Sequence, residues 1–270
     1  MHLNTRLKLA ICLLSLIILW PLCSFCDVWA ADSKLLWLVN PSHPLDFRYG
    51  PQQMTHVNGY PIRPEAGEAF LKMYTDMRAA GIHGLRLQSA YRPFQYQKAL
   101  YDLKVKELAK KGHDQQTALT MASQSVAVPG TSEHQTGLAI DVSINGQLCE
   151  GFGNTEAGVW LKNNSDRYGF IVRYPKEKTD ITQIVYEPWH LRYVGIPHSL
   201  YMRENNMCFE EYIDYIKEVK AFLYWVDEEH YYKVTYSTIP PENLEACDFS
   251  SIGQNKESGY IITEYKSCQR

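Results

Sequence analysis

The sequence has no excess of basic residues and no internal repeat or low-complexity tract. Its 27 lysines and arginines are outnumbered by 30 aspartates and glutamates, which gives a net charge of -3. Proteins that bind nucleic acid carry a basic surface, so this balance argues against a nucleic-acid partner. With 45% hydrophobic and 21% charged residues, the composition is that of an ordinary globular protein. A length of 270 residues suits one well-buried domain with appendages.

Cysteine is sparse, with seven residues in the chain. Three of the seven lie before residue 27, and the four others are separated too widely for a C-x-x-C pair, so no cysteine zinc site is expected. An even number in an oxidising compartment permits two disulfides, and a bridge between the last two cysteines would staple the tail. The pairing stays open among Cys149, Cys208, Cys247 and Cys268.

A long apolar run stands at the amino terminus. Arg6 and Lys8 precede the apolar residues 9–25, and the small residues Ala30 and Ala31 follow. This order is typical of a secretory signal that is cleaved after one of the two alanines. The alternative is an uncleaved membrane anchor, because the run is just long enough to cross a bilayer. In both cases the rest of the chain is predicted to lie outside the cytoplasm, in the periplasm or on the cell-wall side of the membrane.

Hydrophobic periodicity predicts an α+β fold, with a small, mostly antiparallel sheet and helices packed to one side. Residues 32–62 are predicted to form an irregular lead-in. Three parts are expected: a signal peptide or membrane anchor at 1–31, the main domain at 32–224, and a small strand-containing extension at 225–270. Helices are predicted at 64–80, 94–111, 114–126, 159–168, 197–204 and 209–222, and strands at 85–89, 138–142, 169–174 and 184–194.

The first stretch with chemical potential runs from Ser132 to Asp141. A loop histidine, His134, precedes an aspartate within an otherwise apolar strand. An aspartate is costly to bury unless it is paired or bound to a metal. Gly137 and Ala139 are small and let the backbone pass close to another group. A histidine nitrogen and an aspartate oxygen are ligands that zinc accepts.

The second stretch runs from Glu187 to Tyr193. In a strand, Trp189 and His190 face opposite ways, so His190 can complete a set of two histidines and one aspartate. Catalytic zinc sites use three such ligands and leave the fourth position for water. Glu187, held in extended geometry by Pro188, is placed to reach that water. Trp189 is interpreted either as a wall of the substrate pocket or as a core residue.

The third stretch, Ser89-Ala90-Tyr91-Arg92-Pro93, follows a predicted strand. The Arg92 guanidinium offers several fixed donors, which suit an oxyanion or a substrate carboxylate. Each of the three stretches alone has an ordinary structural reading as a salt bridge, a turn or a core residue. Their combination is much more specific than any one of them.

Together the three stretches resemble the signatures of the VanY-type D-alanyl-D-alanine carboxypeptidases, part of a larger group of zinc peptidases that includes the VanX dipeptidases. The likeness extends from about Leu36 to Ile216. It implies the small α+β fold shared with the Hedgehog signalling domain, one Zn²⁺ ion, and a peptidoglycan stem peptide ending in D-Ala-D-Ala as substrate. Residues 32–224 are then the zinc D,D-carboxypeptidase domain.

The resemblance also implies roles for single residues. Glu187 matches the catalytic base, and Arg92 matches the arginine that stabilises the transition state. The metal ligands are His134, Asp141 and His190, and the predicted substrate-binding residues are Ser132, Tyr91, Ser89, Gln97 and Trp189. An L,D-carboxypeptidase, a D,D-dipeptidase and a non-catalytic peptidoglycan-binding module with a structural zinc remain as alternatives. The last of these needs neither Glu187 nor Arg92.

Overall fold

The computed structural model describes residues 33–241, 248–254 and 259–268. The described chain combines two four-stranded antiparallel sheets and one two-stranded hairpin with helices, so the α+β prediction is confirmed. The helices are α1 (Pro64–Ala79), α2 (Phe94–Lys110), α3 (Gln115–Ser125), α4 (Glu156–Asn164), α5 (Thr179–Thr182), α6 (His198–Glu204) and α7 (Phe209–Val219), and the short 3-10 turns are η1 (Glu133–Thr136), η2 (Glu150–Asn154), η3 (Ser165–Tyr168) and η4 (Lys176–Lys178).

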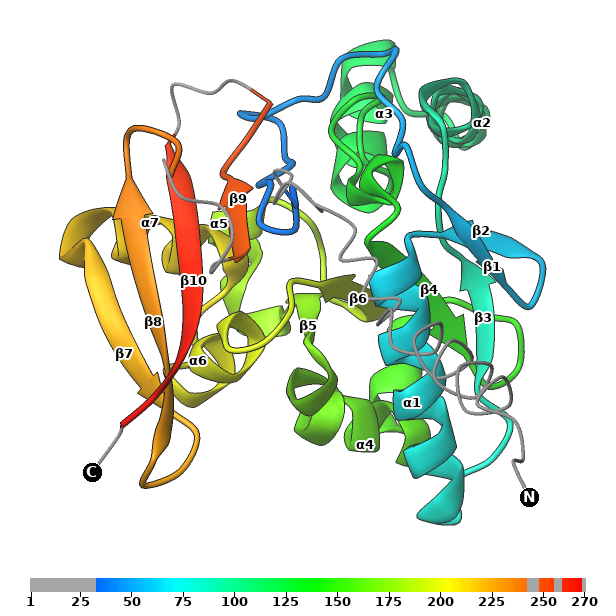
Figure 1. The fold of residues 1–270 in the computed structure, drawn as a ribbon. Coiled ribbons are helices and arrows are strands. Elements are labelled where there is room, and N and C mark those ends of the chain that lie inside the picture. The colour runs from blue at the N-terminus through cyan, green and yellow to red at the C-terminus, as the bar shows by residue number, and fades with distance from the viewer. Residues whose placement is uncertain (1–32, 242–247, 255–258, 269–270) are drawn as a thin grey trace, which may run out of the picture.

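The strands divide into three groups in sequence order. The hairpin contains β1 (Thr55–Val57) and β2 (Tyr60–Ile62). The central sheet contains β3 (Arg86–Ser89), β4 (Ala139–Ser143), β5 (Phe170–Tyr174) and β6 (Glu187–Tyr193), and the C-terminal sheet contains β7 (Ala221–Trp225), β8 (His230–Ser237), β9 (Asp248–Ser251) and β10 (Tyr260–Ser267). Figure 1 shows the C-terminal sheet, in orange and red, on one side of β5 and β6, with α1, α4 and the hairpin on the other.

The central sheet brings the three chemically interesting stretches side by side. Its strand order is β3-β4-β6-β5, and every pair is antiparallel. Asp141 on β4 lies directly opposite His190 on β6 and opposite Ser89 on β3. Residues that are about 50 positions apart in the chain therefore share one row of the sheet.

Helix α1 covers this sheet, and its sequence explains both of its ends. Pro64 occupies the first helical turn, where the missing N–H costs nothing, and Gly81 follows the helix at a φ of +84°. Ala66, Phe70 and Met73 are buried, as their spacing predicts, in a core that also contains Leu87, Ile140 and Leu191 from the sheet.

Part of the lead-in that was expected to be irregular is the β1–β2 hairpin. Asn58 and Gly59 form its two-residue turn, at φ values of +50° and +84°. Asn-Gly is the preferred pair for a hairpin turn with positive φ at both positions, because Gly has no Cβ and Asn tolerates the left-handed region. The prediction was wrong here because three-residue strands give too short a pattern to read.

The predicted helix at 209–222 ends earlier, at Val219. Lys220 adopts a φ of +66°, and Ala221 begins strand β7, which pairs with β8. The predicted domain boundary at residue 224 falls inside this strand. Helical and strand residues are both apolar here, so periodicity does not separate them.

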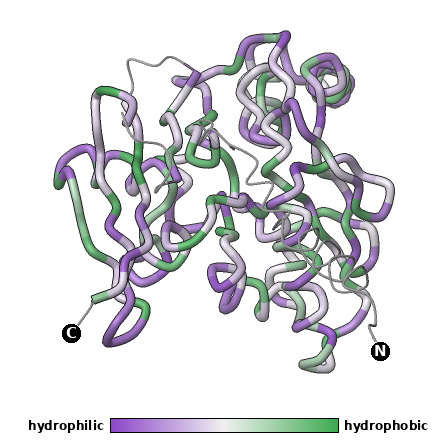
Figure 2. The backbone as a smooth tube through the Cα atoms, viewed as in Figure 1, coloured by the Kyte–Doolittle hydropathy of each residue, from purple (hydrophilic) through white to green (hydrophobic). Residues whose placement is uncertain are grey.

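The C-terminal sheet, with strand order β7-β8-β10-β9, packs onto the rest of the molecule through a second core. Val234 on β8 and Ile261 on β10 are fully buried there, together with Leu36 of the lead-in and Phe209 and Ile213 of α7. Hydrophobic and hydrophilic colours are mixed along β7 and β8 in Figure 2, as expected for a sheet with one buried face. The extension therefore shares its core with the main domain.

Cys149, Cys208 and Cys268 are free thiols, and Cys247 lies outside the described residues. None of these three thiols takes part in either of the two disulfides that the cysteine count permits. The predicted signal peptide or anchor at 1–31 also lies outside the described residues. Across the part of the chain that the structure describes, no helix has the length and apolar character needed to span a membrane.

Candidate metal centre

The three predicted metal ligands meet in the middle of the central sheet. One ligand atom from each of His134, Asp141 and His190 lies within 4.8 Å of the other two, and all three residues are buried. His134 comes from η1, Asp141 from β4 and His190 from β6. Antiparallel pairing of β4 with β6 is the reason that Asp141 and His190 meet, since they occupy one register position.

His134 is oriented by the backbone of the segment from Ala90 to Arg92. Its Nδ1 lies 2.6 Å from the carbonyl oxygen of Ala90, and its own carbonyl accepts the backbone N–H of Arg92 at 3.1 Å. Since a carbonyl only accepts, Nδ1 carries the hydrogen and Nε2 keeps a free lone pair. Nε2 is buried 3.2 Å from Asp141 Oδ2, without the alignment of a hydrogen bond. An inward lone pair of this kind is what a metal ligand requires.

His190 directs its Nδ1 toward the same point, whereas His134 directs its Nε2 there. Its Nδ1 is 3.1 Å from Asp141 Oδ1 and 3.7 Å from Glu187 Oε2. The ring of Tyr174 packs 4.9 Å from the His190 ring and closes one side of the site. Two imidazole nitrogens and a carboxylate oxygen around one point form the donor set of a catalytic zinc site, so the residues present fit that ion.

The charges of the ligands reflect their burial and their neighbours. Burial favours the neutral carboxyl of Asp141, but His134 and His190 hold its pKa well below the usual value. Burial and the Arg92 charge lower the pKa of His134 to about 4. Burial acts the same way on His190, yet the hydrogen bond to Asp141 and the proximity of Glu133 raise its pKa to about 9. A cation that binds here displaces the His190 proton and gains a third ligand.

Glu187 and Arg92 both lie next to the triad. The Glu187 side chain is 12% exposed, and burial raises the pKa of its carboxyl to about 7. It lies beside His190 but is not one of the three converging ligands. Arg92 places Nη2 3.9 Å from Asp141 Oδ2, and its side chain is 18% exposed. The site thus has a carboxyl group that can gain or lose a proton, and it also has a guanidinium cation. Both groups lie within reach of the ligands.

The predicted substrate-binding residues differ in their surroundings. Ser132 is buried directly before η1, and Tyr91 is partly exposed, with its backbone N–H bonded to Pro61. Gln97 is buried and donates from Nε2 to the Ala127 carbonyl at 2.7 Å, which ties α2 to the loop that leads into η1. Ser89 lies opposite Asp141.

Trp189 is half-buried against the main core, which also contains Leu191 two positions along β6. Side chains two apart in a strand share a face, so Trp189 and His190 lie on opposite faces of β6, as predicted. In this position Trp189 supports the sheet that carries the ligands.

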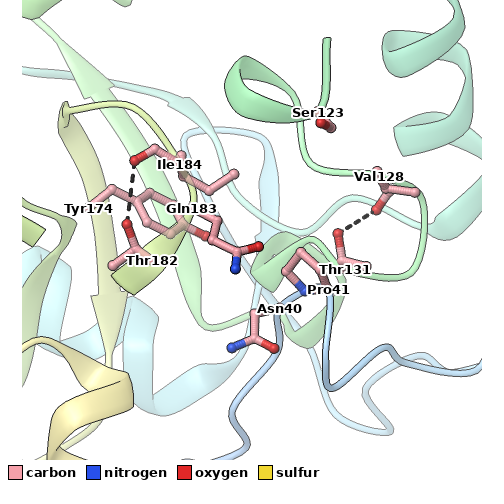
Figure 3. A pocket seen from close by; sticks show the side chains of 9 residues that line it. All are labelled: Asn40, Pro41, Ser123, Val128, Thr131, Tyr174, Thr182, Gln183 and Ile184. Carbon is pink, nitrogen blue, oxygen red and sulfur yellow. Dashed lines mark hydrogen bonds between the residues drawn. The ribbon is translucent and has the colours of Figure 1, made fainter. Parts of the chain in front are cut away.

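A pocket lies on the other side of Tyr174, whose ring contacts His190, and Figure 3 shows its lining, which contains none of the three ligands. Tyr174, which contacts His190, forms one side, and Thr131, next to Ser132, forms the other. Asn40 and Gln183 add side-chain amides to the lining.

Sequence reasoning missed a buried ionic network behind the metal ligands. Glu133 lies between two guanidinium groups, with Arg173 Nε at 2.8 Å and Arg192 Nη1 at 3.0 Å from its Oε1. Arg173 also pairs with Glu210 on α7. Arg173 and Arg192 are fully buried in strands β5 and β6. An arginine inside an apolar strand pattern is the signal that could have revealed the network, because such a charge needs a buried partner.

Comparison with known proteins gives a family match over the part that carries this site. A family model described as VanY, D-alanyl-D-alanine carboxypeptidase, matches residues 59–196. The putative carboxypeptidase YodJ of Bacillus subtilis (strain 168) is 38% identical over an alignment of 199 residues, and the match covers 69% of this chain and 69% of that protein. The family match spans the three motif stretches.

Solved structures agree with this match. The vancomycin resistance D,D-pentapeptidase VanY, in complex with Zn(II), is 38% identical with a TM-score of 0.60, and the match covers 67% of this chain and 98% of that one. The LdcB LD-carboxypeptidase is 37% identical with a TM-score of 0.59 and coverages of 67% and 86%. The D,D-dipeptidase VanXYg, in complex with a D-Ala-D-Ala phosphinate analog, is 29% identical with a TM-score of 0.68 and coverages of 86% and 94%. The predicted family fold is confirmed.

Proposed function

Because this chain belongs to the VanY family of D-alanyl-D-alanine carboxypeptidases, we propose that it removes the terminal D-alanine from peptidoglycan stem peptides that end in D-Ala-D-Ala. The observation that carries the proposal is the meeting of His134, Asp141 and His190 at one buried point with Glu187 beside them. The enzyme is a zinc metallopeptidase, and these three residues hold its ion. A bound Zn²⁺ supplies a Lewis acid that activates water near neutral pH and polarises a carbonyl.

Glu187 is the group that moves the proton. Its Oε2 lies 3.7 Å from His190 Nδ1, so the carboxylate borders the point at which the ligands converge. A carboxylate there takes the proton from the attacking water and returns it to the departing amine of D-alanine. Its limited exposure keeps this proton from exchanging freely with bulk water.

Arg92 supplies positive charge to the oxygen that becomes negative as the peptide bond is attacked. Its guanidinium is held near the ligands by the Asp141 contact, and its backbone N–H is fixed by His134. Donors that are oriented before the reaction stabilise a tetrahedral oxyanion without reorganisation. A purely structural zinc site has no need for either Arg92 or Glu187, which favours an enzyme over a binding module.

Hydrolysis of the free dipeptide D-Ala-D-Ala, the reaction of a D,D-dipeptidase, is the second candidate. The VanXYg match covers 86% of this chain. Residues 1–224 make up only 83% of the 270 residues, so the VanXYg match must include part of the C-terminal extension. The VanY match covers 67%. The likeness to a dipeptidase therefore includes part of the C-terminal extension.

We also propose that the protein acts outside the cytoplasm, where its substrate class is found. The support is the basic start, apolar run and small residues within 1–31. Amino-terminal sequencing of the protein from fractionated cells should find it outside the cytoplasm and beginning after Ala30 or Ala31, or intact and held in the membrane. Intact protein confined to the cytoplasmic fraction would contradict the proposal.

Mass spectrometry of substrate cleavage tests the activity. The zinc-loaded protein is incubated with a wall pentapeptide ending in D-Ala-D-Ala, a tetrapeptide with an L,D bond, and free D-Ala-D-Ala. Loss of one alanine from the pentapeptide, abolished by a chelator and restored by zinc, is the expected result. Loss restricted to the tetrapeptide would indicate an L,D-carboxypeptidase, and cleavage restricted to the free dipeptide a D,D-dipeptidase. No cleavage of any of the three would contradict an enzymatic role.

A further inference from the structure

Two buried polar atoms face each other at the back of the metal centre without a hydrogen-bond partner. Glu133 Oε2 and His190 Nε2 are 3.9 Å apart, and each is buried and unpartnered among the described residues. One atom accepts hydrogen bonds, and the other can donate one. A buried polar atom without a hydrogen bond costs free energy of folding, so the placement of these two atoms next to each other calls for an explanation.

The His190 ring is divided between two surroundings. Its Nδ1 faces Asp141 and Glu187, on the side where the three ligands converge. Its Nε2 faces away from that point, toward Glu133. In a neutral imidazole only one nitrogen carries hydrogen, and only the other has a lone pair for a metal. The tautomer of His190 therefore decides whether it is a ligand.

We propose that Glu133 is a positioning residue for the metal centre: its Oε2 accepts a hydrogen bond from His190 Nε2 and so directs the Nδ1 lone pair to the ion. This inference rests on the zinc site of the proposed function and goes beyond it. In other metal sites a carboxylate behind a ligating histidine fixes the ring orientation in the same way.

Glu133 is held in place for this role by its second oxygen. Arg173 and Arg192 both contact Oε1, which leaves Oε2 directed at His190. Arg192 is itself anchored, because its Nη2 donates to the carbonyls of Leu35 and Trp37 at 2.8 and 3.0 Å. The carboxylate is thus fixed by strands β5 and β6 and by the lead-in before any metal binds.

The charges of the network also favour an acceptor at this position. Glu133 and Glu210 contribute two negative charges, and Arg173 and Arg192 contribute two positive charges, so the set is balanced without a proton from His190. Glu133 can therefore stay ionised while buried. A residue needed only to neutralise the arginines would have no reason to leave one oxygen unpaired beside a metal ligand.

Replacing Glu133 by glutamine tests the inference, with Glu210→Gln as the matched control. In Glu133→Gln the amide oxygen must face the two guanidinium groups, which turns the NH₂ donor toward His190 Nε2 and favours the wrong tautomer. In Glu210→Gln the same network loses one negative charge without contact to His190. Zinc affinity is measured by competition with a chelator of known affinity, alongside unfolding by denaturant for both variants.

We expect Glu133→Gln to bind zinc about 10- to 100-fold more weakly than the parent, and Glu133→Asp to recover part of the loss. Glu210→Gln should lose stability but keep the parent affinity. Equal zinc affinities for Glu133→Gln and Glu210→Gln would overturn the inference. Because these readouts do not involve peptide hydrolysis, a parent protein that binds no zinc would refute the proposed function instead.

A second measurement decides the case if Glu133→Gln fails to fold. Nitrogen-15 NMR of the zinc-loaded parent reports which nitrogen of His190 carries hydrogen. Hydrogen on Nε2 with zinc on Nδ1 is the expected result. Zinc on Nε2 would overturn the inference whatever the variants do.

Discussion

Glu187 lies beside the metal ligands but is not one of them. A substitution of this single residue can therefore change turnover without changing metal binding. We predict that Glu187→Gln keeps one zinc ion per chain but loses about 10²- to 10⁴-fold in kcat, because the amide cannot accept the proton. Metal analysis checks the zinc content, and D-alanine release measured on the same sample checks the loss of kcat. Turnover close to that of the parent would refute the assignment of Glu187 as the base.

Arg92 gives a second prediction at this scale. Arg92→Ala should lower kcat by about 10²- to 10³-fold while zinc stays bound, since the guanidinium stabilises charge that develops during the reaction. Arg48→Ala is the matched control, because Arg48 is exposed, pairs with Asp46 two positions before it and lies over the neighbouring Phe47 ring, away from the metal ligands. Steady-state kinetics should show no change in the control. Equal effects of the two substitutions would remove Arg92 from the mechanism.

The metal ligands could be predicted from the sequence, and the residues behind them could not. Asp141 stands out because a carboxylate within an apolar strand demands a partner. Glu133 sits next to His134 in the sequence, yet its partners Arg173 and Arg192 lie on two other strands. Their meeting depends on the register between β5 and β6, which the sequence does not specify by itself.

Gly169 illustrates how a turn fixes an element, here the start of β5. It adopts a φ of +80°, and a Cβ there would lie 2.7 Å from the Tyr193 ring and 3.0 Å from Gly195 Cα. Gly146 has a similar φ of +85° but open space around it. We predict that Gly146→Ala costs about 1 kcal/mol of unfolding free energy from backbone strain alone, and that Gly169→Ala costs clearly more. Urea unfolding checks this, and equal costs would contradict the packing described for Gly169.

His198 at the start of α6 joins two other elements. Its Nδ1 is 2.6 Å from the Tyr212 hydroxyl on α7, and its Nε2 is 3.2 Å from Thr263 Oγ1 on β10. Burial lowers the pKa of His198 from 6.5 to about 3. The unfolded chain therefore binds this proton first as the pH falls, so the stability contributed by neutral His198 is complete above pH 6.5 and decreases between pH 6.5 and about 3.

We predict that the unfolding free energy of the parent falls more steeply with decreasing pH in that window than that of His198→Gln. The difference in slope should approach 1.4 kcal/mol per pH unit, to an order of magnitude. Comparing the two proteins cancels the titration of the metal ligands, which both retain. Parallel pH profiles would contradict the burial of a neutral His198.

The sequence predicted long periodic elements well and short ones poorly. Helix α1 could be placed within one residue because Pro64 and Gly81 mark its ends and four turns of apolar spacing lie between them. The boundary between α7 and β7 was misplaced because Phe222 continues the apolar pattern while belonging to the strand. Tertiary pairing with β8 decides its conformation, and local preference does not.

At the scale of the whole molecule, the C-terminal sheet and the metal-binding domain are expected to unfold together. Ile261 on β10 is fully buried among residues of the lead-in, α6 and α7. Ile261→Ala should lower the unfolding free energy by about 2 to 5 kcal/mol, with a single transition at a lower temperature. Calorimetry of the full chain checks this. Two separate transitions, with only one of them shifted, would show that the extension is an independent domain.

The shared core explains why the extension could be detected in the sequence but not placed. Leu36 and Leu38 precede the main helices by many residues, yet they pack against Val234 and Ile261 near the other end of the chain. Sequence patterns show that such residues are apolar, and they do not show which of them meet. The arrangement of the two sheets therefore required the structure.

The proposed hydrolysis depends on one ion held by two imidazoles and one carboxylate at the central sheet. Diffraction from zinc-loaded crystals, recorded at the zinc absorption edge, locates that ion directly. We predict a single strong anomalous peak at about 2.0 to 2.2 Å from His134 Nε2, a carboxylate oxygen of Asp141 and His190 Nδ1. A peak bound by other residues, or no peak among these three, would contradict the account.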